Sequence, residues 1–152
     1  MWFACVFIQA GWLIVPALLY LVFHLRWIGQ LQELYLIILL GIGGYVLDTL
    51  LQWIGIFSFE SVIPPVWLLA LWLVFSSTLC HLFKWLHQRF ALTVFLGAIG
   101  GASAYASAVV LGAGESHLSP LVLFLVMAIV WAGWFPLCIY LAASYLQNYR
   151  LS

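Results

Sequence analysis

The sequence predicts an all-α membrane protein, an integral membrane bundle of about five transmembrane helices. Hydrophobic residues make up 68% of the 152-residue chain, and charged residues make up only 5%. A soluble fold must cover its surface with polar side chains, which this chain lacks, so lipid is the expected solvent. The aromatic share of 18% is typical of helices that are anchored at both membrane interfaces.

The few polar residues of the chain separate its first three apolar stretches. The first stretch ends at His24 and Arg26, and the second ends at Gly55. We expect the third to begin at Pro64-Pro65, since proline is tolerated in the first turn of a helix and disfavoured further inside it. Each stretch is close to the roughly 20 apolar residues that a helix needs to cross a hydrocarbon core.

Two more stretches of this kind follow. The fourth begins at Phe90, after the basic residues Lys84 and Arg89, and gives way to a polar segment rich in glycine. The fifth opens at Ser119-Pro120, where Ser119 is a suitable N-cap. We therefore expect one transmembrane domain, residues 1–152, with spans at about 2–23, 34–54, 64–83, 90–111 and 119–145.

The charges predict the orientation of these spans. With five crossings, every basic residue falls on one side of the membrane: Arg26, Lys84, Arg89 and Arg150. The loops on the opposite side carry Glu60 and Glu115 and no basic residue. The positive-inside rule then places the N-terminus outside and the C-terminus in the cytoplasm.

Asp48 is the residue that most needs an explanation, because it lies inside the second span. Ionisable groups in that position are costly and usually face protein or a water-filled cavity. The residues at three- and four-residue steps around it form one small and polar stripe: Gly41, Gly44, Asp48, Gln52 and Gly55. Small residues let helix backbones approach closely, so we expect this stripe at a helix–helix contact.

Helix counting gives the expected neighbours of Asp48. It lies seven positions before Gly55, and therefore roughly 10 Å below the outer boundary at 1.5 Å per residue. Comparable depths on other helices are reached at Gln9, Trp72 and Tyr105. We expect these four residues to form a buried polar layer, in which Asp48 either transfers a proton or anchors a ligand, or else serves as a hydrogen-bonded strut between helices.

No metal site and no cofactor is predicted. Three histidines near the inner boundary, His24, His81 and His87, lack the depth or spacing that would favour haem or metal ligation. One segment contains the residue types of a hydrolytic triad, but adjacent side chains point apart: Glu115, Ser116 and His117. The loop from Lys84 to Arg89 mixes basic and aromatic residues, which suits anionic lipid head groups, although its simpler role is to set topology.

Several segments together are similar to a known family. The first is Gly44-Tyr45-Val46-Leu47-Asp48-Thr49-Leu50, and the second runs from Trp67 to Leu86 in the pattern WLxxLWxxFxxTL…WL. With Gly97-Ala98-Ile99-Gly100-Gly101 and Tyr105, they resemble the bacterial inner-membrane family catalogued as domain of unknown function 2878. One departure is that this chain has Gly101-Ala102 where the family pattern has a Gly-Pro pair.

The resemblance implies a small multi-pass protein of the bacterial inner membrane, without an established activity. Because relatives are encoded near fatty-acid-modifying enzymes, it also implies a lipid-related role. The formal net charge of zero argues against a nucleic-acid partner.

Three classes of function follow from the sequence. We favour a protein that binds a lipid or other lipophile in an intramembrane polar site, as an accessory to fatty-acid or lipid modification. The expected lining residues are Asp48, Trp72, Tyr105 and Gln9. The alternatives are a structural or assembly subunit, as a homo-oligomer or with a partner membrane subunit, and an intramembrane enzyme or proton-coupled transporter that uses Asp48.

Overall fold

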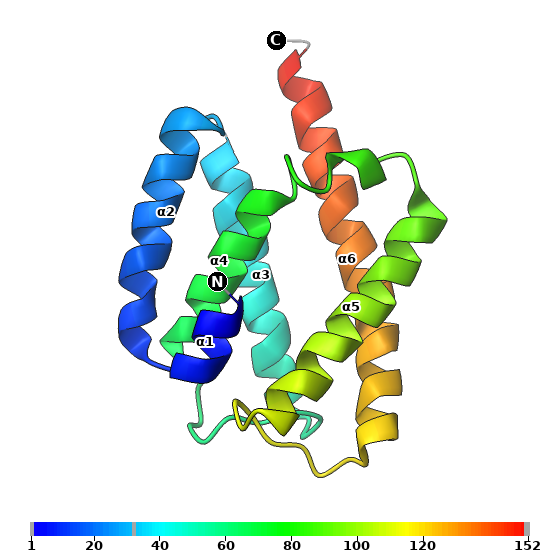
Figure 1. Cartoon of the computed structure of the whole chain (residues 1–152). Coiled ribbons are helices and arrows are strands. Elements are labelled where there is room, and N and C mark those ends of the chain that lie inside the picture. The colour runs from blue at the N-terminus through cyan, green and yellow to red at the C-terminus, as the bar shows by residue number, and fades with distance from the viewer. Residues whose placement is uncertain (1, 32, 151–152) are drawn as a thin grey trace. The chain divides into compact units, whose positions relative to one another are not determined.

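The computed structural model of the chain describes residues 2–31 and 33–150, with backbone only for 146–150. Residues 1 and 152, at the ends of the predicted domain, and the Arg150 side chain lie outside the described residues. The predicted all-α class is confirmed (Figure 1), since every regular element among the described residues is a helix. One isolated β-bridge in this part of the chain joins Ser58 to Glu115. The helices are α1 (Trp2–Ile8), η1 (Gly11–Leu13), α2 (Ile14–Trp27), α3 (Glu33–Trp53), α4 (Val66–Thr78), η2 (Lys84–Leu86), α5 (Phe90–Val110) and α6 (Pro120–Arg150).

Three of these helices are long and apolar enough to cross a membrane. They are α3, α5 and the part of α6 from Pro120 to Tyr145. Their bounds lie close to the predicted spans 34–54, 90–111 and 119–145, because a helix satisfies the backbone hydrogen bonds of a long apolar run within the run itself, as lipid requires. By length and composition these are the helices of a membrane protein.

The helix expected over residues 2–23 is interrupted in the structure. The backbone leaves the helix at Gln9, which has a positive φ of 50°, an uncommon conformation for a residue other than glycine. The chain then makes the three-residue η1 before the 14-residue α2 begins at Ile14. The apolar stretch is therefore divided into a short α1 and a second helical segment, Gly11–Trp27.

The helix expected over residues 64–83 is also shorter than predicted, since α4 has 13 residues. Two serines near its end donate their hydroxyls to carbonyls of the preceding turn, Ser76 to Trp72 at 2.8 Å and Ser77 to Val74 at 2.7 Å. Such bonds compete with the regular helix ladder. The Thr78 carbonyl then accepts the amides of His81 and Leu82, which closes the helix in a turn.

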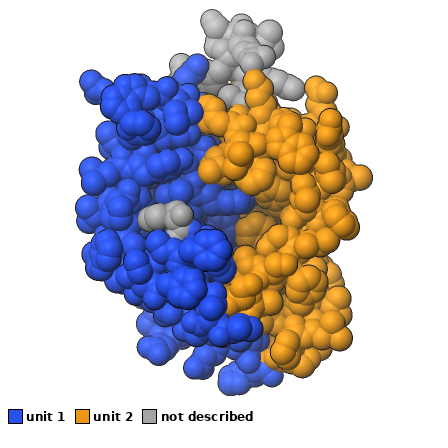
Figure 2. All heavy atoms as spheres, viewed as in Figure 1, with its two compact units in different colours: residues 1–77, 109–117 blue, residues 78–108, 118–152 orange. Residues whose placement is uncertain are grey.

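The chain divides into two compact units (Figure 2). Unit 1 comprises Met1–Ser77 with Val109–His117, and unit 2 comprises Thr78–Ala108 with Leu118–Ser152. The expectation of a single domain over residues 1–152 stays a prediction.

Within unit 2, α5 and α6 approach closely at two glycines. A Cβ atom on Gly97 would lie 2.8 Å from the carbonyl oxygen of Trp131, and one on Gly101 would lie 2.0 Å from Cγ of the same tryptophan. Gly100, on another face of α5, has open space around it. The small residues of the fourth apolar stretch therefore include two that make room for α6.

Replacing Gly101 by alanine should destabilise the protein, because the new methyl group overlaps the Trp131 ring. Overpacking of this kind costs about 1–3 kcal/mol. The matched control is Gly100→Ala, which adds the same methyl group in open space and should be neutral or slightly stabilising. Thermal unfolding in mild detergent, followed by circular dichroism, separates the two. Equal melting temperatures for both variants would contradict the close α5–α6 contact.

Candidate functional site

The centre of unit 1 is a hydrogen bond between the two residues that the sequence analysis placed at equal depth. Nε1 of Trp72 on α4 donates to Oδ2 of Asp48 on α3 at 2.6 Å. Both residues are buried, with exposed fractions of 2% for Asp48 and 5% for Trp72. A hydrogen bond in an apolar interior is stronger than the same bond in water. The pair therefore links α3 to α4.

The glycines before Asp48 make this bond possible. A Cβ atom on Gly44 would lie 2.1 Å from the Trp72 ring, and one on Gly41 would lie 2.7 Å from the Leu73 side chain. The indole therefore occupies the space above Gly44, one helical turn from the carboxylate that it binds. Gly41, Gly44 and Asp48 therefore lie at a helix–helix contact, as predicted, whereas Gly55 lies beyond the end of α3 with open space around it.

Two other polar residues of α3 bind the segment that leads into α4. The Tyr45 hydroxyl donates to the carbonyl of Pro64. The Gln52 amide donates to the carbonyls of Ser61 at 2.7 Å and Val62 at 2.9 Å. Since Tyr45 and Gln52 flank Asp48 on one helix, α3 holds both α4 and the segment before it in place.

The structure places Gln9 and Tyr105 in other surroundings. Gln9 is exposed at the break after α1, where its amide donates to the carbonyl of Gly112 at 3.1 Å. Tyr105 belongs to unit 2, where its ring lies 6.3 Å from the Trp131 ring, centroid to centroid. Of the four residues predicted to line a ligand site, only Asp48 and Trp72 are joined by a bond shown here, and Gln9 is not buried. Helix counting was wrong for Gln9 because the helix ends there. Whether the four residues bind a ligand stays a prediction.

Unit 1 also contains an open cleft of ≈ 710 Å³ that the sequence did not reveal. It lies between the break at Gln9, the segment before α4 and the segment after α5. Its polar lining includes the amide of Gln9, two carboxylates and an imidazole, and its apolar lining includes two aromatic rings. These residues are Gln9, Glu60, Glu115, His117, Phe59 and Trp67.

Backbone hydrogen bonds hold the walls of this cleft together. Ser58 and Glu115 exchange two backbone bonds, 2.9 Å and 2.8 Å long. The Ser116 hydroxyl donates to the carbonyl of Ile56 at 2.7 Å. The Phe59 and Trp67 rings meet edge to face, with centroids 5.7 Å apart. The bonds that hold the walls use backbone groups and a serine hydroxyl, so the carboxylates of Glu60 and Glu115 remain exposed, and neither forms an ion pair with a described residue.

The sequence analysis missed these carboxylates as a pair because they are 55 positions apart and come from two different loops. Hydrophobic periodicity describes helices and strands and carries no information about which loops meet. The one signal available was the predicted topology, which places both loops on the same side of the membrane.

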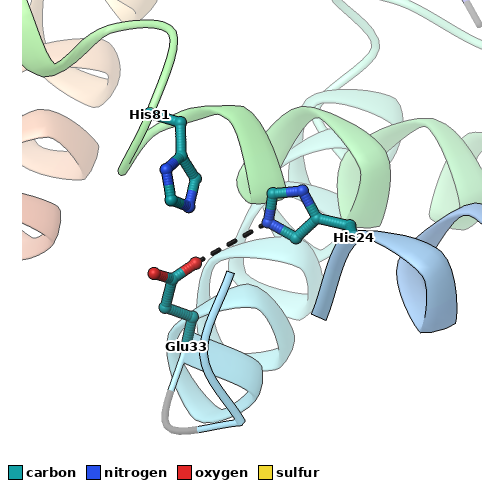
Figure 3. Close-up of side chains that lie close together, drawn as sticks. All are labelled: His24, Glu33 and His81. Carbon is teal, nitrogen blue, oxygen red and sulfur yellow. Dashed lines mark ion pairs between the residues drawn. The ribbon is translucent and has the colours of Figure 1, made fainter. Parts of the chain in front are cut away.

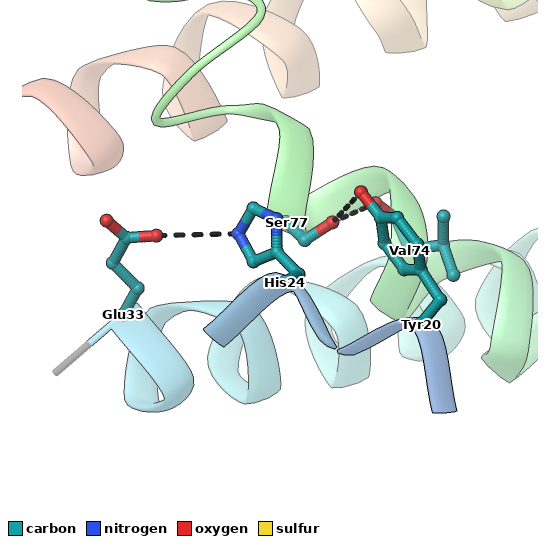
Figure 4. Close-up of polar contacts among 5 residues, drawn as sticks. All are labelled: Tyr20, His24, Glu33, Val74 and Ser77. Atoms are coloured by element: carbon teal, nitrogen blue, oxygen red, sulfur yellow. Dashed lines mark hydrogen bonds and ion pairs between the residues drawn. The ribbon is translucent and has the colours of Figure 1, made fainter. Parts of the chain in front are cut away.

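A second buried polar pair links the last turn of α2 to the first turn of α3. His24 Nε2 lies 3.6 Å from Glu33 Oε2 (Figure 3), and both residues are at least 95% buried. A Cβ atom on Gly29 would lie 2.8 Å from that carboxylate oxygen and 3.0 Å from His24 Nε2, so the absence of a side chain at Gly29 leaves room for the pair. Nearby, Ser77 of α4 lies 3.4 Å from the Tyr20 hydroxyl of α2 (Figure 4). We had placed His24 at the membrane boundary and had not identified Glu33 as its neighbour.

The Asp48–Trp72 bond predicts a difference between two substitutions of Asp48. Asn keeps an oxygen that accepts the indole N–H, so Asp48→Asn should change stability little. Leu has a similar shape and no acceptor, so Asp48→Leu should cost about 1–3 kcal/mol by leaving that N–H without this bond. Thermal unfolding in mild detergent measures both variants. An Asn variant as unstable as the Leu variant would show that the negative charge, and not the acceptor, is what unit 1 requires.

Comparison with known proteins identifies a family without a known activity. No curated protein and no solved structure matches the chain. The family described as "Protein of unknown function (DUF2878)" matches residues 1–137, which confirms the resemblance found in the sequence. The match covers the Asp48–Trp72 pair, both walls of the cleft and the first half of α6. The chain belongs to this family, the DUF2878 proteins of unknown function.

Proposed function

We propose that this protein binds a lipid or other lipophile whose polar head group enters the cleft of unit 1. The observation that carries the proposal is the cleft itself, where two exposed carboxylates, Glu60 and Glu115, lie beside the aromatic residues Phe59 and Trp67. A pocket that is partly apolar and has a few convergent polar groups is the usual form of a small-molecule site. The apolar helices beside it provide a surface for the acyl chains.

The lining favours a head group that carries an amine. No lysine or arginine is among the described residues that line the cleft, so the two carboxylates give it a negative charge. Carboxylates form strong charge-assisted hydrogen bonds with ammonium groups. The face of a tryptophan ring also attracts cations. The amide of Gln9 is held by Gly112 and forms part of the same wall.

In this proposal Asp48 and Trp72 hold the cleft and do not line it. They fix α4 against α3, and Trp67, five positions before Trp72 on the same helix, contributes to the cleft. This modifies the site expected from the sequence, in which Asp48 was the ligand's anchor. The buried bond also favours a second candidate function, a structural or assembly subunit whose polar residues only pack helices. It makes proton transfer by Asp48 in an enzyme or transporter the weakest of the three.

We also propose that α2 to α6 cross a bacterial inner membrane five times, with the N-terminus outside. The segment Gly11–Trp27 replaces residues 2–23 as the first crossing. At 1.5 Å per residue its length is about 26 Å, and short spans are accommodated by local thinning of the bilayer. The bridge between Ser58 and Glu115 supports this topology, because it requires both acidic loops to lie on one side.

Neutralising the two carboxylates of the cleft should release the ligand. Wild-type protein in mild detergent should carry an amine-containing lipid, detected as a stoichiometric mass by native mass spectrometry. Each charged hydrogen bond contributes about 1.5–3 kcal/mol, so Glu60→Gln with Glu115→Gln should weaken binding by more than tenfold. The matched control is Asp48→Asn, which makes the same acid-to-amide change in the same unit but outside the cleft.

The outcomes of this experiment separate the candidate functions. Loss of the bound lipid only in Asp48→Asn would favour the intramembrane site predicted from the sequence. A wild-type protein that carries no lipid, and takes up none when phosphatidylethanolamine is added, would contradict the binding function and favour the assembly subunit.

The proposed topology predicts a cytoplasmic C-terminus. A fluorescent protein fused to the C-terminal end should fluoresce in bacterial cells, and alkaline phosphatase fused at the same point should stay inactive, because it folds only after export. Fusions placed after Gly112 should give the reverse result. An active phosphatase at the C-terminal end would overturn the predicted orientation.

A further inference from the structure

The loop between Lys84 and Arg89 in unit 2 presents two cations and a tryptophan on a fixed frame. Lys84, Trp85 and Arg89 are exposed, and the guanidinium carbon of Arg89 lies 5.9 Å from the centre of the Trp85 ring. This distance is within the range of a cation–π contact, in which an arginine stacks on an aromatic face and keeps its N–H groups available for an anion.

The frame of this loop is built from buried groups. Leu86, in the middle of the loop, is 1% exposed. The Thr93 hydroxyl on α5 lies 3.2 Å from the carbonyl of Leu86 and 3.0 Å from that of Arg89, and it donates to these oxygens. The His87 ring lies 3.4 Å from the carbonyl of Leu79. The backbone on either side of the two cations is therefore held in position.

No acidic side chain of unit 2 neutralises these cations. All four Asp and Glu residues of the sequence, Glu33, Asp48, Glu60 and Glu115, belong to unit 1. Neither Lys84 nor Arg89 forms an ion pair with any residue that the structure describes. The loop is thus a positive site, and no acidic side chain of its own unit can neutralise it.

Large apolar side chains are exposed in this loop and directly beside it in the sequence. Leu82 is 64% exposed, Trp85 50% and Phe90 75%. Exposed tryptophan next to basic residues is typical of the level at which lipid head groups lie. A site for a free anion in water would not need apolar groups of this size on both sides.

We propose that the loop from Lys84 to Arg89 binds the phosphate group of an anionic phospholipid. Arg89 donates paired hydrogen bonds to the phosphate oxygens, Lys84 contributes a second positive charge, and Leu82, Trp85 and Phe90 contact the acyl chains. This site is independent of the amine-binding cleft, because it belongs to the other unit and has the opposite charge. Setting the orientation of the chain requires only that the positive charges be present. Binding one phosphate group also requires the backbone of the loop to hold the two cations in fixed positions.

The test compares lipid binding by matched variants of the whole chain. Protein in neutral detergent is titrated with phosphatidylglycerol or phosphatidylcholine, and bound lipid is counted by native mass spectrometry. Wild-type protein should prefer phosphatidylglycerol, and Arg89→Gln should reduce that preference about fivefold or more. Arg89→Lys keeps the charge without the paired donors, so its affinity should lie between the two.

Arg26→Gln is the matched control, because Arg26 is also exposed and followed by an exposed tryptophan, yet belongs to unit 1. It should leave the preference unchanged. If Arg26→Gln and Arg89→Gln lowered the preference for phosphatidylglycerol equally, net charge alone would explain the preference, and the proposal would be overturned. Displacement of phosphatidylglycerol by millimolar inorganic phosphate would overturn it too, since the loop would then be a site for free anions. Both residues are exposed, so the variants should unfold at the wild-type temperature.

Discussion

A carboxylate inside an apolar helix bundle must have a partner, and the rest of unit 1 follows from how Asp48 meets this requirement. Its bond to Trp72 brings a tryptophan of α4 against α3, which leaves no space for a side chain at Gly44. Tyr45 and Gln52 bind the segment before α4 from the same helix. The position of Trp67 in the cleft therefore depends on a bond made deeper in the unit. A polar group that is costly in lipid thus constrains the packing of α3 and α4, because a movement that separates the two side chains breaks this bond.

Hydropathy was sufficient to predict α3, α5 and α6, and it was insufficient for the first and third apolar stretches. The long helices are determined by length and composition, which the sequence displays directly. The break at Gln9 depends on one residue with a positive φ, and the early end of α4 depends on the hydroxyls of Ser76 and Ser77. These are local hydrogen-bonding and backbone effects among residues that a hydropathy average treats as interchangeable. Their consequence is two short helices in place of two predicted spans of full length.

The candidate site shows the same division. Counting along helices paired Asp48 with Trp72, and the bond between them agrees with the prediction that this part of the stripe faces another helix. Counting gives no information beyond the end of a helix, so it misplaced Gln9. The cleft is formed by segments that are distant in sequence and joined by backbone bonds between Ser58 and Glu115, which any residue types could form. No pattern in one sequence identifies such a contact, whereas the buried carboxylate was evident from a single residue.

With only four acidic and four basic residues, the placement of each charge carries information. Burial in an apolar interior penalises a charge heavily unless it is paired, and both buried acids, Asp48 and Glu33, lie against a potential hydrogen-bond donor, an indole and an imidazole respectively. The remaining acids are exposed in the cleft, and the exposed cations Lys84 and Arg89 are held on a rigid loop in a unit without acids. Charges that only set orientation need no such support. The two proposals of a ligand of opposite charge therefore rest on the hydrogen bonds that order the backbone around each exposed set.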